Sequence, residues 1–155
     1  AEAPDWDPLA REGVARVLAR AERERGLPVL LVVAVIERES RYDPDAVGPR
    51  GACGLMQLRP FVARDVARRH GMAFDDAHVF DPVINVRLGV RYLGELREAF
   101  GTAELALAAY NMGPTRVRRR LARGGRVRGP YVSSLVERWS ELRSRYGITE
   151  AAIGG

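Results

Sequence analysis

Two glutamates, Glu37 and Glu39, stand at the end of the most apolar stretch of this 155-residue chain, Leu27 to Ile36. They are two positions apart, about 200° around a helix axis, so only one of them can face a given cleft. Burial disfavours an ionised carboxyl group, and a carboxyl group that stays protonated near neutral pH can donate a proton to a leaving oxygen. The pattern offers one working acid, although a helix end with solvated glutamates is the ordinary interpretation of such a pair.

An apolar helix is expected to position this acid. Every residue from Val29 to Ile36 is apolar, so a helix over this stretch has no polar face and should lie in the middle of the domain. Helix-forming residues from Glu37 to Glu39 continue it, and we expect the turn Tyr42-Asp43-Pro44 to end it, because the residue before a proline disfavours the helical region. The sequence thus places a carboxyl group at the end of a buried helix.

Four further motifs follow one another along the chain. They are Glu39-Ser40, the turn Asp43-Pro44-Asp45-Ala46-Val47, Gly51-Ala52 with Gly54-Leu55-Met56-Gln57, and Ala108-Ala109-Tyr110-Asn111 with Gly113-Pro114. Together they resemble the lytic transglycosylases of the Slt type, bacterial cell-wall enzymes with a goose-type lysozyme-like fold. The resemblance covers roughly residues 27–135. Each motif alone is a weak signal. The signal is strong because all four motifs occur in the same order as in the family.

The chain departs from the family pattern at two places. The family commonly has a serine where this chain has Gly48 before Pro49. The residue to which a hydrogen bond with the substrate is attributed is therefore absent here. The later family pattern of Glu-Thr followed by Tyr-Val survives only as Gly129-Pro130-Tyr131-Val132. Tyr131 is therefore assigned on a shorter match than Tyr110.

The resemblance implies cleavage of the β-1,4 bond between MurNAc and GlcNAc in peptidoglycan by a single glutamate. Glu39 would donate a proton to the leaving oxygen while the acetamido group of the sugar assists. As a carboxylate it would then accept a proton from the 6-hydroxyl of the muramic acid, which closes a 1,6-anhydro ring. No second carboxylate, metal or cofactor is implied, and Asp43 and Asp45 are more simply turn residues.

The remaining motif residues are implied substrate contacts: Ser40, Met56, Gln57, Tyr110, Asn111 and Tyr131. Amides such as Gln57 and Asn111 can both donate to and accept from acetamido and hydroxyl groups. Met56 would offer an apolar wall, and Tyr110 would stack on a sugar ring. For each residue the alternative is packing at a helix end, and for Ser40 it is capping or orienting the loop.

Composition excludes several classes of protein. With 46% apolar residues the chain should form one domain over residues 1–155. The longest apolar run, about ten residues, is about half of what a bilayer requires, and the start Ala1-Glu2-Ala3 resembles a trimmed, exported protein of the periplasm or cell envelope. Cys53 has no partner cysteine and is interpreted as a small packing residue. His70 and His78 are not spaced for a metal site.

The basic charge is local. All basic residues are arginine, and seven of them fall in a stretch without acids: Arg116, Arg118, Arg119, Arg120, Arg123, Arg126 and Arg128. The rest of the chain has 18 arginines and 20 acidic residues, so the net charge of +5 comes from this arginine strip. It indicates either contact with an anionic polymer or protein, or a solvated helix face.

The expected fold is mainly α, a lysozyme-like helical domain around a buried central helix with at most a small β-hairpin near 47–58 or 124–132. The motif-bearing core is about 27–135. We expect helices at 8–25, 61–70, 82–100, 104–110, 115–122 and 131–146, an irregular connection at 72–80 and a tail at 147–155. Asp81-Pro82, Gly101 and Thr102 mark helix boundaries.

Three other functions compete with the transglycosylase. They are a lysozyme-like hydrolase, a non-catalytic glycan-binding or assembly module, and a nucleic-acid binder that uses the arginine strip. The strip has no aromatic residue for base stacking, and no helix-turn-helix or zinc spacing occurs, so specific nucleic-acid binding is not expected. We expect a monomer that contacts peptidoglycan glycan strands.

Overall fold

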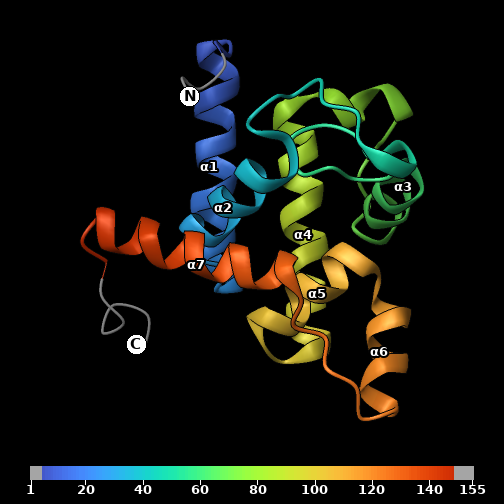
Figure 1. Ribbon diagram of the computed structural model, residues 1–155. Helices are drawn as coiled ribbons and strands as arrows, with labels where there is room; N and C mark the ends of the chain where they lie inside the picture. The colour runs from blue at the N-terminus through green and yellow to red at the C-terminus, as the bar shows by residue number, and fades with distance from the viewer. Residues whose placement is uncertain (1–4, 149–155) are drawn as a thin grey trace. The chain divides into compact units, whose positions relative to one another are not determined.

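The computed structural model describes residues 5–148, and these form two compact parts that meet in sequence between Gly94 and Glu95. Across the described range the protein has seven α-helices, two short 3-10 helices and no strand (Figure 1). The expected mainly α fold is therefore confirmed. The single domain over residues 1–155 stays a prediction, and most of the expected tail, residues 149–155, lies outside the described residues.

The first part begins with two helices that pack against each other, α1 (Pro8–Arg25) and α2 (Val29–Ser40). The side chain of Asp7 caps α1 by accepting a hydrogen bond from the Leu9 N–H at 3.3 Å. Gly26 ends it in the left-handed region, with φ of 61°, where a side chain would be strained. Together these signals confirm the helix expected at 8–25.

Most of α2 is buried, as its composition predicts. The buried residues are Leu31, Val32, Ala34, Val35, Ile36 and Ser40, while Val29, Leu30 and Val33 keep some exposure. The end of the helix differs from the expectation. It stops at Ser40 because Arg41 and Tyr42 have φ of 52° and 65°, so a left-handed turn ends α2 before Asp43 and Pro44 are reached.

An irregular loop, residues 41–59, follows α2, and we call it the motif loop. It contains the 3-10 helix η1 (Pro49–Gly51) and two isolated antiparallel bridges, Val47 with Cys53 and Cys53 with Leu58. The sequence allowed a small β-hairpin at 47–58, and only these two bridges form there. The backbone hydrogen bonds of the loop form turns and single bridges rather than a continuous ladder, so buried polar groups outside them need side-chain partners.

Asn85 supplies that support from α4 (Pro82–Phe100). Its amide is fully buried, accepts a hydrogen bond from the Met56 N–H at 2.8 Å, and donates to the Cys53 and Val79 carbonyls at 3.0 and 2.7 Å. Gly54 makes room for it: a Cβ on Gly54 would lie 2.4 Å from the Asn85 Nδ2. The amide therefore fastens the motif loop to α4.

Two further elements complete the first part, α3 (Pro60–Arg69) and the 3-10 helix η2 (Asp76–Phe80), which contact each other. The connection at 72–80, expected to be irregular, thus contains a short helix. Asp75 caps it by accepting from the Ala77 N–H, and the His78 Nδ1 accepts from the Asp75 N–H. A capping box in so short a segment was not anticipated because aspartate and histidine are its less common members.

The second part contains the end of α4 and three helices, α5 (Ala103–Met112), α6 (Pro114–Ala122) and α7 (Pro130–Arg145), with α5 packed against both others. The Thr102 hydroxyl caps α5 by accepting from the Leu105 N–H at 3.2 Å. The buried residues of α5 are Ala106, Leu107, Ala108 and Ala109. The small side chains of the three alanines allow close helix packing. Within residues 5–148 no helix is both long enough and apolar enough to cross a bilayer.

The role of Asn85 can be tested by substitution. Asn85→Ala removes three hydrogen bonds and leaves one N–H and two carbonyls buried without that partner, so we expect the free energy of unfolding to fall by about 3 kcal/mol. Urea denaturation followed by circular dichroism measures this change. Thr102→Ala, which removes only an exposed cap on α5, should lower it by about 1 kcal/mol. Equal losses for the two variants would contradict the proposed support of the motif loop.

Candidate functional site

Glu39 lies in the last turn of α2, after the buried residues that anchor the helix, and its side chain is half-buried. The neighbouring Arg38 is exposed, and Glu37 is half-buried like Glu39. Partial burial alone therefore does not separate the two glutamates.

A hydrogen bond from the N-terminal segment holds the backbone just after Glu39. The indole N–H of Trp6 donates a hydrogen bond to the carbonyl oxygen of Tyr42 at 2.8 Å. Tyr42 is one of the two left-handed residues of the turn, a conformation that costs about 1 kcal/mol or more for residues other than glycine. The turn that follows the carboxyl group is thus fixed from outside α2. Sequence analysis missed this role of Trp6, because the two residues are far apart along the chain.

Ser40 is buried, and its hydroxyl donates a hydrogen bond to the carbonyl of Ile36 at 3.0 Å. The only proton of the hydroxyl is therefore used within α2, as in a residue that shapes the end of a helix. The oxygen retains its capacity as an acceptor. The assignment of Ser40 as a substrate contact stays a prediction.

Gln57 has a left-handed backbone, with φ of 49°, and its side chain folds back over the motif loop. Its Nε2 donates to the carbonyls of Ala46 and Gly54 at 3.0 and 2.9 Å. Its Oε1 lies where a side chain at position 48 would be: a Cβ on Gly48 would be 2.1 Å away. Both amide protons of Gln57 are occupied, and the lack of a side chain at Gly48 leaves room for this conformation.

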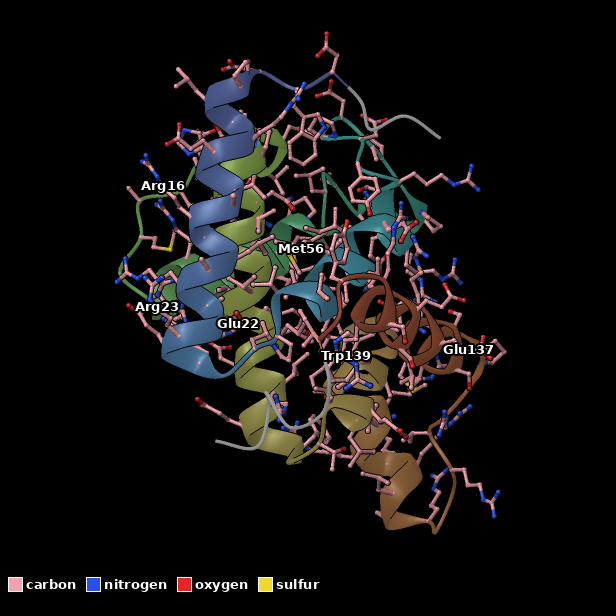
Figure 2. The ribbon with its side chains drawn as sticks, turned by 90° about the vertical axis from the view of Figure 1, so that its left-hand side faces the viewer. Arg16, Glu22, Arg23, Met56, Glu137 and Trp139 are labelled. Carbon is pink, nitrogen blue, oxygen red and sulfur yellow. The ribbon has the colours of Figure 1, made fainter. Side chains whose placement is uncertain are left out.

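Met56 and Cys53 lie inside the first part. Met56 is fully buried (Figure 2), and a Cβ on Gly89 of α4 would lie 2.3 Å from its sulfur. A side chain with no exposed surface reaches a substrate only after the loop rearranges, so its place in the substrate site stays a prediction. Cys53 is buried as well, and burial raises the pKa of its thiol. A protonated, buried thiol fits the packing role expected of it.

The other predicted contacts belong to the second part. Tyr110 and Asn111 lie in the last turn of α5, before Gly113, as expected, and Tyr131 lies in the first turn of α7. Asn111 is exposed, whereas both tyrosines are half-buried. Glu39, Ser40, Met56 and Gln57 thus belong to the first part, and Tyr110, Asn111 and Tyr131 belong to the second.

The arginine strip occupies α6 and the turn after it, and all seven of its arginines are exposed. Arg118 lies over the ring of Phe100 with its guanidinium carbon 5.1 Å from the ring centroid, and Arg128 approaches Glu104 at 3.5 Å. Within residues 5–148 no group of three metal-binding side chains is arranged to hold an ion.

Sequence analysis also missed Asn85, the residue that positions Met56 and the motif loop. A signal for it was available: Asn85 is the one amide among the apolar residues that face the core from α4, and a buried polar residue is retained only with partners. The coupling of Gly48 to Gln57 had no such signal, because the two residues are nine positions apart in an irregular loop.

Comparison with known proteins places these features in a family. The model of the transglycosylase SLT domain matches residues 16–129. The soluble lytic murein transglycosylase of Escherichia coli K12 is 33% identical over 95 residues, which are 59% of this chain and 15% of that protein. The membrane-bound lytic murein transglycosylase F of Desulfosudis oleivorans is 34% identical over 109 residues, 66% of this chain and 22% of that protein.

Solved structures agree with the sequence relatives. An inactive mutant of the lytic transglycosylase Slt from Pseudomonas aeruginosa superposes with a TM-score of 0.78 at 29% identity, covering 92% of this chain and 25% of that one. A complex of the 70-kDa soluble lytic transglycosylase with bulgecin A has the same TM-score at 25% identity and covers 90% of this chain. The chain spans at most about a quarter of these relatives. Since the family model matches well over half of its residues, this chain belongs to the transglycosylase SLT domain family.

Proposed function

We propose that this domain cleaves the β-1,4 bond between MurNAc and GlcNAc of peptidoglycan and leaves a 1,6-anhydro-muramic acid end. The match of the family model across residues 16–129 carries the proposal, since it spans the four motifs. The relatives are named as lytic murein transglycosylases. The proposed site of action is the peptidoglycan of the periplasm or cell envelope, for a monomeric, exported protein.

Glu39 is the proposed acid and base. Its protonated carboxyl group gives its proton to the glycosidic oxygen as the bond to the anomeric carbon breaks, and the acetamido oxygen bonds to that carbon. The carboxylate then takes the proton of the 6-hydroxyl, whose oxygen replaces the acetamido oxygen. Support comes from its position at the half-buried end of α2 and from the inactive P. aeruginosa mutant, in which glutamine replaces a glutamate.

The substrate contacts are proposed with separate roles. Tyr110 and Tyr131 stack on sugar rings, and Asn111, which is exposed, hydrogen-bonds acetamido and hydroxyl groups. Met56, Ser40 and Gln57 shape the loop after the acid, with direct contact for Gln57 only if its amide leaves the loop carbonyls. No metal or cofactor takes part in this scheme.

We expect Glu39→Gln to lower the rate of glycan cleavage by at least about a hundredfold, because glutamine cannot transfer the proton. Digestion of purified peptidoglycan followed by mass spectrometry measures the rate and the product together. Glu37→Gln is the matched control, since it makes the same change about 200° away on the same helix, and it should retain most of the activity.

The same digest separates the competing functions. Anhydro ends support the transglycosylase, whereas products heavier by one water identify a hydrolase. Glycan that binds to the protein without being cut identifies a non-catalytic module. Wild-type turnover by Glu39→Gln would remove Glu39 from the mechanism.

The coupling of Gly48 and Gln57 can be tested with a double-mutant cycle. Gly48→Ala forces the Gln57 amide to turn away and lose two hydrogen bonds, so we expect it to lower the free energy of unfolding by about 1–2 kcal/mol. In a Gln57→Ala background the same substitution should have little effect, because the crowded oxygen is gone. Urea denaturation of the four proteins gives the coupling energy. Additive effects would show that the two positions are independent.

A further inference from the structure

Helices α1 and α4 lie side by side within the first part (Figure 2). Near the start of both helices a Cβ on Gly13 would lie 2.6 Å from the Val83 Cγ2, and further along a Cβ on Gly94 would lie 3.3 Å from the Arg25 Cδ. The two contacts show that the helices run in the same direction for about three turns. A cavity of about 260 Å³ opens between them.

Arginines line this cavity from both helices. Arg16 and Arg20 are four residues apart on α1, and Arg87 and Arg91 are four apart on α4, so each pair presents its side chains on one side of its helix. Arg25 completes the set, and Glu24 is the only acidic lining residue. We call these five arginines the arginine groove; Arg23, also on α1, is not among the residues that line the cavity.

The positive charges of the groove are poorly neutralised. Glu24 pairs with Arg20 at 2.8 Å, and Arg16 pairs with Glu12. Within the described part of the chain, no carboxylate lies at ion-pair distance from Arg25, Arg87 or Arg91. Burial lowers the pKa of Arg91, and the neighbouring charges of Arg25, Arg20 and Arg87 lower it further, against a smaller opposing effect of Glu24. The guanidinium groups that line the groove thus repel one another.

We propose that the arginine groove binds a compact multivalent oxyanion of the diphosphate class. Guanidinium groups present paired N–H donors that match phosphate oxygens, and several of them around one cavity favour an anion of more than one charge. The volume is slightly below that of pockets for drug-sized molecules, so the anion is small or is the exposed end of a larger molecule. None of the groove arginines belongs to the motifs that include Glu39, so this site is separate from the proposed cleavage chemistry.

Isothermal titration calorimetry with inorganic pyrophosphate at low ionic strength tests the site. We expect wild-type protein to bind, and Arg87→Gln with Arg91→Gln to weaken binding at least tenfold, since two guanidinium groups are lost. The matched control, Arg119→Gln with Arg123→Gln, removes the same charge from the arginine strip and should bind like wild type. Glu39→Gln should also bind like wild type, whatever its activity.

Thermal unfolding provides a second readout that does not depend on binding heat. Pyrophosphate should raise the Tm of wild type and of the control, but not that of the groove variant, because only a folded groove binds the anion. The groove variant should itself unfold at or above the wild-type Tm without pyrophosphate, since the substitutions relieve repulsion. This result also shows that its loss of binding is not a loss of folding.

Sedimentation with vesicles identifies the source of the phosphate. Groove-dependent binding to vesicles of phosphatidylglycerol and phosphatidylcholine, absent with phosphatidylcholine alone, identifies a lipid headgroup. Pyrophosphate binding without vesicle binding identifies a free anion. No pyrophosphate binding by the wild type, or an equal loss in the groove and control variants, would overturn the proposal.

Discussion

The burial of α2 is the constraint on which the candidate site depends. Val35 and Ile36 are at most 2% exposed, and removing such side chains from their surroundings costs about 1.5–3 kcal/mol each. The helix therefore cannot rotate or slide without opening the core. Glu39 follows Ile36 by less than one turn, so the packing of α2 positions the backbone that carries its side chain. The left-handed turn and the Trp6 hydrogen bond then fix the direction in which the chain leaves.

Side-chain amides add to the backbone hydrogen bonds of the motif loop. The loop forms only isolated bridges, and its carbonyls at Ala46, Cys53 and Gly54, which already accept from backbone N–H groups, also accept from Gln57 and Asn85. Each amide reaches its partners because a glycine leaves space, Gly48 for Gln57 and Gly54 for Asn85. Buried polar groups of this kind specify one loop conformation, since any other leaves several of them without partners. The irregular backbone is thus as well determined as a helix.

How much of this could be read from the sequence depends on the range of the interaction. Helix boundaries were predictable where the signal is local, as with the Asp7 and Thr102 caps and the Gly26 end. The turn that ends α2 begins at Arg41, one residue before the expected Tyr42-Asp43-Pro44 turn, because the proline is a visible signal in the sequence and a left-handed arginine is not. Glu39 and Tyr110 could be singled out from ordered motifs. The Gln57 conformation and the arginine groove depend on contacts between distant or irregular segments, which no local pattern encodes.

Arginine has two different physical environments in this protein. In the arginine strip the guanidinium groups are exposed, so water and counterions screen their repulsion and the local charge costs little stability. In the groove Arg91 is partly desolvated and three neighbouring guanidinium groups act on it, as the lowered pKa of Arg91 records. Screening is weaker there, so the same charge destabilises the fold more. Apolar side chains, among them Val17, Ala21 and Val83, also line the cavity, and Gly13 of α1 approaches Val83 of α4 closely. An anion held between the helices would convert their repulsion into attraction, whereas at the strip it would change little in the stability of the fold.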